Sequence, residues 1–216
     1  MELTQEAIQN LRQEYRSATL SEQEIEKDPI EQFSKWFQEA LAANIYEPNV
    51  MTLATADSYG KPSARILLLK GFDQKGFVFF TNYESRKGKE LLENPQASMV
   101  FFWAELERQV RIDGVISKID ESESTAYFHS RPKGSQIGAL ASPQSSVIPD
   151  RTVLEEQVKI LTETYAESEV PKPGYWGGYL LEAQHIEFWQ GRPSRLHDRI
   201  IYDLADGNWL INRLAP

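Results

Sequence analysis

The 216-residue chain contains no cysteine and no long apolar run. It therefore has no disulfide, no thiolate nucleophile and no Cys-ligated zinc or iron–sulfur site. The longest unbroken apolar run, residues 99–104, is too short to span a membrane. The first twenty residues contain no apolar segment typical of a secretory signal, and the three histidines are too scattered for a helix-borne metal site. We expect a cytoplasmic protein without a metal or a membrane partner.

Positive charge is also scarce. Lys and Arg number 23 against 32 Asp and Glu, so the formal net charge is −9. Duplex nucleic acid and anionic membranes are bound through basic surfaces, and neither is an expected main partner. Aromatic residues are plentiful, with nine Tyr, ten Phe and five Trp, which excludes a disordered chain.

The periodicity of apolar residues predicts a mainly β, α+β fold. The expected helices cover residues 4–17, 28–41, 85–93, 121–130 and 152–165. The expected strands cover residues 50–56, 63–69, 77–81, 98–103, 109–118, 175–181, 185–190, 199–203 and 208–212. Strands and helices do not alternate regularly, which argues against a doubly wound sheet. We predict a single domain over residues 1–216, built on an antiparallel barrel with flanking helices.

Local signals add detail to this prediction. Asp28 followed by Pro29 is typical of a helix start, and Thr152 with Glu155 has the spacing of a capping box. Residues 66–69 are apolar on both alternations, so we expect that strand to be covered on both faces.

Two of the four clusters of positive charge lie at residues 65–70 and 85–89. If Ser85 caps a helix, Arg86 and Lys87 lie in its first turn, where the helix dipole disfavours cations. A bound anion would reverse that penalty; the alternative is a pair of solvated side chains. Arg65 and Lys70 are five residues apart on a strand, so they point to opposite faces and do not hold the same group. Basic residues that mark a strand end are the alternative.

The third cluster surrounds Tyr127 and Arg131, which lie one turn apart on a helix that Pro132 must end. With Ser135 as the cap of a following helix, this arrangement suits a phosphate monoester, although a helix–turn–helix with an incidental Arg remains open.

The fourth cluster contains Arg195, His197 and Arg199. In an extended chain these three side chains point to one face, which favours an anionic or electron-rich partner. An Arg-rich edge strand that prevents aggregation is the alternative. The chain has no P-loop, Rossmann glycine pattern or nucleophile elbow, so the usual nucleotide-binding folds and a hydrolase are not indicated. The residues indicate a β-barrel protein that binds small phosphorylated ligands, and the clusters leave room for two such ligands.

Eight segments that include these clusters follow one another along the chain. They are RILLLK (65–70), FVFFTNYESRKGKEL (77–91), RQVRIDG (108–114), YFHSRPKGSQIGA (127–139), SPQSSVI (142–148), WGGY (176–179), EFWQGRPSRLHDR (187–199) and RLAP (213–216). Together they resemble the pyridoxine (pyridoxamine) 5′-phosphate oxidases, flavoproteins of the FMN-binding split-barrel fold. The similarity begins near residue 11 and covers essentially the whole chain.

The resemblance implies one FMN per subunit, bound at a homodimer interface with residues from both subunits. One departure from the family is Phe80 before Thr81, where the family commonly has Tyr. The flavin site implied by position consists of Arg65, Ile66, Leu67, Leu68, Leu69, Lys70, Phe80, Thr81, Arg86, Lys87, Gln109, Gln144, Ser145, Trp189 and Arg199.

The resemblance also implies where the substrate binds. Arg195 and His197 would face the pyridine ring as catalytic residues, with no base assigned. Arg12 and Tyr15 would close over the site, as part of an N-terminal helix or lid in residues 1–20. The implied holders of the substrate phosphate are Lys70, Tyr127, Arg131 and Ser135.

The implied reaction oxidises pyridoxamine or pyridoxine 5′-phosphate to pyridoxal 5′-phosphate, with hydride transfer to flavin N5 and dioxygen as the acceptor. Two rival functions remain. One is another FMN protein of the same fold, such as a flavin reductase, which would have no reason to carry Tyr127, Arg131, Ser135, Arg195 and His197 together. The other is a non-catalytic carrier of pyridoxal phosphate or FMN, which would bind its ligand without consuming dioxygen.

Overall fold

The computed structural model describes residues 4–11 and 14–216, so Arg12 lies outside the described residues. The chain divides into two compact units. Unit 1 is formed by the described part of residues 1–48 and by residues 100–112 and 185–216. Unit 2 is formed by residues 49–99 and 113–184. The single domain expected over residues 1–216 stays a prediction.

The described residues form a nine-stranded sheet with the order β2-β1-β5-β6-β7-β4-β3, and β8 and β9 continue from β7. The strands are β1 (Val50–Ala56), β2 (Pro62–Leu68), β3 (Gly71–Asp73), β4 (Gly76–Asn82), β5 (Gln96–Trp103), β6 (Arg108–Lys118), β7 (Trp176–Gln190), β8 (Asp198–Ala205) and β9 (Asn208–Arg213). Antiparallel pairing joins β1 with β2, β3 with β4, β4 with β7, and β8 with both β7 and β9. The predicted antiparallel, mainly β architecture is confirmed.

Two details of the strand prediction were wrong. The strands expected at residues 175–181 and 185–190 are one continuous strand, β7. The short strand β3, which pairs Gly71 with Val78, was not predicted.

The helices occur at the positions expected along the chain, with shifted ends. They are α1 (Gln5–Gln9), α2 (Pro29–Ala42), α3 (Arg86–Glu93), α4 (Glu121–Ser130), α5 (Lys133–Ala141) and α6 (Thr152–Thr164). The helix expected over residues 4–17 is therefore much shorter, and residues 14–17 are not helical.

The helix starts confirm two predicted caps and contradict two. Asp28 accepts hydrogen bonds from the N–H groups of Ile30 and Glu31. Ser85 accepts one from Gly88 at the start of α3. Ser135 does not cap α5, which starts at Lys133 and has Pro132 in the cap position. The predicted capping box at Thr152 does not form either: Arg151 occupies the cap position of α6, without a side-chain cap.

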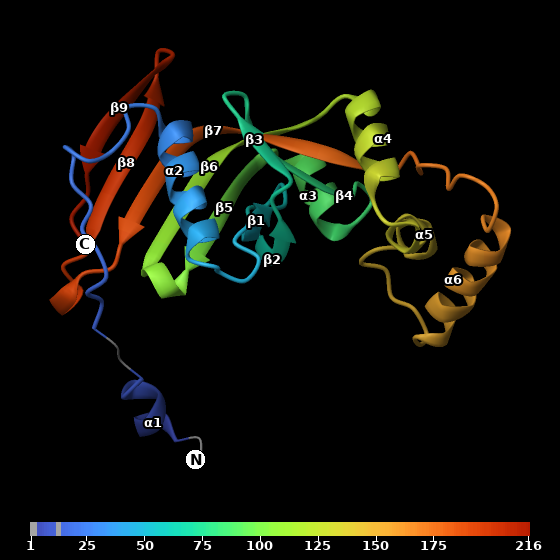
Figure 1. The fold of residues 1–216 in the computed structure, drawn as a ribbon. Coiled ribbons are helices and arrows are strands. Elements are labelled where there is room, and N and C mark those ends of the chain that lie inside the picture. Colours follow the sequence, from blue (N-terminus) through green and yellow to red (C-terminus); the bar gives the residue numbers. More distant parts are fainter. Residues whose placement is uncertain (1–3, 12–13) are drawn as a thin grey trace. The chain divides into compact units, whose positions relative to one another are not determined.

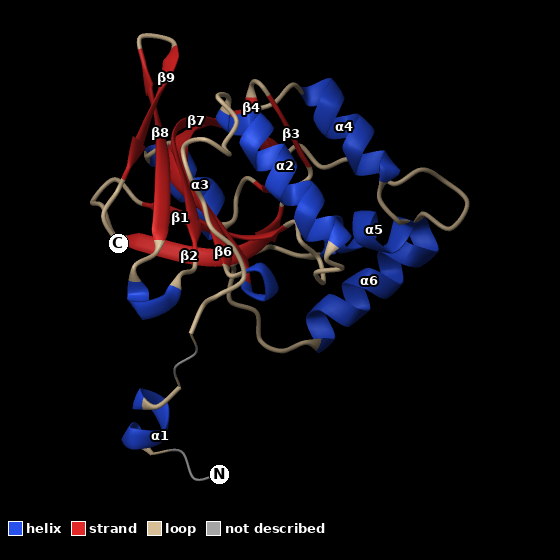
Figure 2. Cartoon of the chain, turned by 60° about the vertical axis from the view of Figure 1, so that its left-hand side comes forward, coloured by secondary structure: helices blue, strands red, loops and turns tan. Residues whose placement is uncertain are grey.

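Unit 1 is organised around an aromatic core. Phe33 on α2 packs edge-on against Phe101 of β5 at a centroid distance of 5.2 Å. On the same helix, Trp36 packs edge-on against Phe188 of β7, also at 5.2 Å. Strands β8 and β9 form a long hairpin, visible in Figure 2, whose register pairs Tyr202 with Ile211. Buried rings on both the helix and the strands hold the helix on the sheet.

Unit 2 combines strands with α3–α6. In Figure 1, α5 and α6 lie beside each other, with α4 leading into α5, and the contacts between these elements agree. Their shared core contains Phe128, Ile137, Val170 and Trp176. Ile66 on β2 is 63% exposed. The expectation that residues 66–69 are covered on both faces is therefore wrong for a single copy of the chain.

Candidate functional site

A cluster of cations lies at the start of α3, in unit 2. Arg65, Arg86 and Lys87 line one cavity of about 370 Å³, together with Gln144 and Ser145. Lys87 is buried, with 7% of its surface exposed, and donates hydrogen bonds to Thr81 (3.1 Å) and Gln144 (3.2 Å). Three cationic side chains beside a helix N-terminus form a binding site for an anionic group.

Burial is costly for the Lys87 ammonium. It lowers the pKa of Lys87 to about 8, and the nearby positive charge of Arg65 acts in the same direction. An anion in the cavity would offset both effects, because it stabilises the charged form of the amine.

Glu90 lies among these cations. One of its oxygens accepts a hydrogen bond from Arg86 Nε (2.8 Å), and the other accepts hydrogen bonds from Thr55 (2.5 Å), Ser63 (2.6 Å) and Arg65 (3.2 Å). Burial alone would raise the pKa of Glu90, but these hydrogen bonds lower it to about 2. The carboxylate is therefore ionised at neutral pH.

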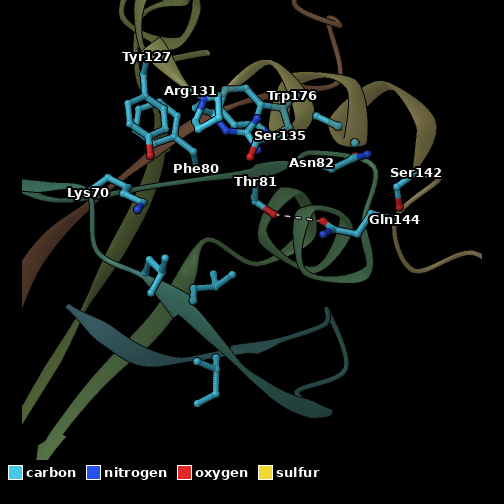
Figure 3. Close-up of a pocket in the computed structure, with 16 residues that line it drawn as sticks. Lys70, Phe80, Thr81, Asn82, Tyr127, Arg131, Ser135, Ser142, Gln144 and Trp176 are labelled. Atoms are coloured by element: carbon cyan, nitrogen blue, oxygen red, sulfur yellow. Dashed lines mark hydrogen bonds between the residues drawn. The ribbon is translucent and has the colours of Figure 1, made fainter. Parts of the chain in front are cut away.

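A second, larger cavity of about 690 Å³ also lies in unit 2. Figure 3 shows Lys70, Tyr127, Arg131 and Ser135 around it, with the Tyr127 hydroxyl on the side of Lys70. Phe80 stacks on Tyr127 at a centroid distance of 3.8 Å. The cavity thus has an aromatic wall with hydroxyl, ammonium and guanidinium groups around it.

Arg131 is the most informative residue of this cavity. Its guanidinium lies over the Trp176 ring, 4.7 Å from the centroid. Nη1 is buried and has no hydrogen-bond partner among the residues that the structure describes. Burial lowers the pKa of Arg131, partly opposed by Tyr127. A buried guanidinium nitrogen without a partner is costly, and an anion in the cavity would satisfy it.

Unit 1 carries the remaining predicted site residues, including a cluster of three rings. Tyr15 packs edge-on against Trp189 at a centroid distance of 5.7 Å, and the Trp189 and His197 centroids are 4.6 Å apart. Gly191 permits this packing, because a Cβ at that position would lie 2.7 Å from the Tyr15 ring. The backbone around Tyr15 is held by Glu107, which accepts a hydrogen bond from Ser17 N (2.9 Å).

His197 is held in one tautomer. Its Nδ1 accepts a hydrogen bond from the N–H of Arg192 (3.1 Å), so a neutral ring carries its proton on Nε2. Burial and the charge of Arg195 lower the pKa of His197, while Asp198 opposes them. The imidazole is therefore neutral and a hydrogen-bond donor through Nε2 at pH 7.

The shared face expected for Arg195, His197 and Arg199 is wrong, because the chain is not extended there. Residues Pro193–Arg195 form a 3-10 turn, and Ser194 and Arg195 have positive φ angles of 58° and 65°. Arg199 lies on β8 and makes a two-point contact with Glu187 (2.7 and 3.0 Å). This contact raises the pKa of Arg199.

The predicted site residues therefore fall into three groups. The larger cavity brings together Ile66, Leu67, Leu68, Lys70, Phe80, Thr81, Tyr127, Arg131, Ser135 and Gln144. The smaller cavity brings together Arg65, Ile66, Leu67, Arg86, Lys87, Gln144 and Ser145. Unit 1 holds Tyr15, Gln109, Trp189, Arg195, His197 and Arg199. Leu69 lines neither cavity and is buried.

Sequence reasoning missed two residues: Trp176, which lines the larger cavity, and Glu90, which contacts two cations of the smaller one. Trp176 was noted only within the segment WGGY, and its contact with Arg131 needs the fold to be seen. Glu90 had a usable signal, because it lies four residues after Arg86 on one helix face.

The sequence and the fold of this chain are similar to those of known proteins. A sequence model of the family described as "Pyridoxamine 5′-phosphate oxidase" matches residues 37–164. The chain belongs to this family. A second model, "Pyridoxine 5′-phosphate oxidase C-terminal dimerisation region", matches residues 176–216. A pyridoxine/pyridoxamine 5′-phosphate oxidase from Acaryochloris marina is 53% identical over 213 residues, covering 99% of this chain and 97% of that protein.

Solved structures support the fold. PhzG from Burkholderia lata, crystallised with tetrahydrophenazine-1-carboxylic acid, has a TM-score of 0.87 and is 32% identical; the match covers 92% of this chain and 98% of PhzG. A pyridoxamine 5′-phosphate oxidase-related, FMN binding protein from Nostoc punctiforme has a TM-score of 0.67 at 17% identity, covering 85% of this chain and 97% of that one. The predicted split-barrel fold is confirmed.

No helix among residues 4–11 and 14–216 is long and apolar enough to cross a membrane. Nor does this part of the chain contain a group of three His, Cys, Asp or Glu side chains arranged to hold a metal ion.

Proposed function

We propose that the chain is an FMN-dependent oxidase that converts pyridoxamine 5′-phosphate and pyridoxine 5′-phosphate to pyridoxal 5′-phosphate, in vitamin B6 salvage. Family membership and the names of close relatives support this reaction. The observation that carries the proposal is Arg131, whose buried Nη1 lacks a partner among the described residues in a cavity also lined by Lys70, Tyr127 and Ser135. A phosphate monoester would supply the missing acceptor.

The residues present fit FMN. The smaller cavity offers three cations to a terminal phosphate, and the neighbouring carboxylate of Glu90 is fully engaged by hydrogen bonds within the protein. Apolar residues 66–68 continue from it along the larger cavity, where a flat ring system would find an aliphatic surface. When bound, FMN would supply the redox chemistry, taking a hydride from the 4′ carbon of the vitamer and passing the electrons to dioxygen.

The chain's own contribution is binding and orientation. Lys70, Tyr127, Arg131 and Ser135 would hold the substrate phosphate, which is remote from the reacting carbon and lowers the barrier by fixing geometry. Arg195 and His197 would contact the pyridine ring. Because neutral His197 donates through Nε2, its role would be a hydrogen bond to the substrate rather than proton removal.

We also propose a homodimer with the flavin at its interface, to which Gln109, Trp189 and Arg199 contribute, and Tyr15 as part of a cover over the substrate together with Arg12. The match of residues 176–216 to a dimerisation region supports the dimer. The cytoplasmic location expected from the sequence is likewise a proposal, tested by fractionating cells and locating the protein by immunoblot.

The experiment that tests the function compares phosphorylated with unphosphorylated vitamers. The FMN-loaded protein should produce pyridoxal 5′-phosphate and hydrogen peroxide from pyridoxamine 5′-phosphate, together with ammonia. Pyridoxamine should be a far poorer substrate, because it lacks the group that Arg131 binds. Ligand binding without consumption of dioxygen would instead favour a carrier, and flavin turnover without vitamer oxidation would favour another FMN protein of this fold.

A further inference from the structure

Glu90 is a carboxylate in direct contact with Arg65 and Arg86, two of the three cations that line the smaller cavity. It lies on α3, one turn after Arg86, and only 6% of its surface is exposed. A negative charge beside a phosphate site should weaken phosphate binding by repulsion. Its presence there therefore needs a physical reason.

The hydrogen bonds of Glu90 supply that reason. Both oxygens are occupied, one by Arg86 and the other by Arg65, Thr55 and Ser63. Arg65 is held on its other side as well, because Nη1 donates to the carbonyl of Leu53 (3.1 Å). Glu90 thus connects a guanidinium on β2 with one on α3.

Arg86 depends more on this contact than Arg65 does. Its side chain is 58% exposed, whereas that of Arg65 is 20% exposed. The contact with Glu90 uses Nε of Arg86, so the two terminal nitrogens lie outside it. An exposed arginine without such an anchor samples many rotamers, and ordering it on binding costs conformational entropy.

Charge balance points the same way. Arg65, Arg86 and Lys87 line one small cavity, and positive charges this close repel one another. A buried carboxylate in contact with two of them reduces that repulsion before any ligand arrives. The ligand then meets cations that are already held in place.

We infer that Glu90 is a positioning residue for the flavin phosphate: it holds Arg65 and Arg86 in the orientation that binds the phosphate, without contacting the phosphate itself. This inference rests on the proposed flavin site. It predicts the opposite sign to simple repulsion, since removing the negative charge should weaken FMN binding rather than strengthen it.

The test uses Glu90→Gln in the full chain freed of flavin. Affinities for FMN and for riboflavin, which lacks the phosphate, are measured by quenching of flavin fluorescence. We expect FMN affinity to fall about 10- to 100-fold, as for loss of contacts to a charged group, while riboflavin affinity changes less than about threefold. Glu93→Gln is the matched control, because it removes the same charge from the same helix, and among the described residues the Glu93 side chain hydrogen-bonds only to Ser58. It should leave both affinities unchanged.

A second variant separates geometry from charge. Glu90→Asp keeps the charge but shortens the side chain, so it should also lose FMN affinity selectively. Thermal unfolding shows whether each variant folds. If Glu90→Gln does not fold, the flavin affinities of Glu90→Asp test the inference.

Three results would overturn the inference. FMN affinity that is unchanged or higher in Glu90→Gln would mean that repulsion dominates. An equal loss for FMN and riboflavin in both Glu90 variants would mean that Glu90 only supports the fold. Wild-type protein that binds riboflavin as tightly as FMN would refute the flavin phosphate site itself, a failure visible before any variant is made.

Discussion

At the scale of single residues, Arg131 links the structure most directly to the proposed substrate. Its guanidinium lies on Trp176 and lines the larger cavity. We predict that Arg131→Ala raises KM for pyridoxamine 5′-phosphate about 10- to 100-fold, the loss expected for a charge-assisted contact of about 1.5–3 kcal/mol. Because the phosphate is bound in both the ground state and the transition state, kcat should change much less.

Steady-state kinetics measure both constants. Lys133→Ala is the matched control, because Lys133 starts α5 near Arg131 but donates to the carbonyl of Ala166 (2.8 Å) and is absent from the cavity lining. A KM for pyridoxamine 5′-phosphate that is unchanged in Arg131→Ala would contradict the assignment of Arg131 to the substrate phosphate.

Lys87 gives a second prediction at this scale. Burial lowers its pKa to about 8, and the protonated amine is the form that attracts a phosphate. The FMN phosphate is already dianionic above about pH 7, since its second pKa is near 6. FMN affinity should therefore be highest below about pH 8 and fall as the pH rises towards 10, by no more than about tenfold per pH unit.

Fluorescence titrations across this range measure the profile, and Lys87→Met should flatten it. A wild-type profile as flat as that of the Met variant would show that Lys87 does not bind the phosphate as a cation.

Much of the residue-level site is predictable from spacing alone. Tyr127 on α4 and Arg131, which caps the end of that helix, reach one cavity. Arg65 and Lys70 line different cavities, as their alternation indicates. The contacts of Glu90 with Thr55 and Ser63 were not predictable, because these two residues are 35 and 27 residues away in the sequence and meet Glu90 only in the folded protein.

At the scale of elements, α3 holds two of the three cations, and its position depends on Gly88. A Cβ at residue 88 would overlap the backbone carbonyl of Tyr83. Gly88→Ala should therefore shift the start of α3, lower the free energy of unfolding by at least about 2 kcal/mol and weaken FMN binding.

Gly134→Ala on α5 is the matched control, because apart from its chain neighbours and the backbone of its own helix no heavy atom lies within 4 Å of the added Cβ. This variant should be neutral or slightly stabilising. Chemical denaturation measures both variants. Equal stability of the two would show that the close approach at Gly88 is not what positions α3.

Elements with a strong local signal were predicted well, and elements set by distant contacts were not. Asp28 and Pro29 mark the start of α2 through their own backbone chemistry. The turn at residues 193–195 needs positive φ angles at Ser194 and Arg195, which residues other than glycine rarely adopt. The sequence therefore predicts an extended chain there. Strand β7 continues through Glu182 without a break because neighbouring strands pair along it, which a local pattern does not reveal.

At the scale of the whole molecule, the proposed flavin site requires more than one copy of the chain. Residues 176–216 match a dimerisation region, and Ile66 on β2 is an apolar side chain left exposed in the single chain. We predict that sedimentation finds a dimer at micromolar concentration, and that dilution to monomer releases FMN because the cofactor lies at the interface. A monomer that keeps its flavin on dilution would rule out the interface site.

The proposed oxidation is observed most directly in the absence of air. The FMN-loaded protein is mixed with pyridoxamine 5′-phosphate while the visible flavin band is recorded. The account predicts that the band bleaches as pyridoxal 5′-phosphate forms and returns when air is admitted, because the flavin takes electrons from the vitamer and gives them to dioxygen. A band that only shifts, with no product, would contradict the oxidase and mean that the cavity binds the vitamer without oxidising it.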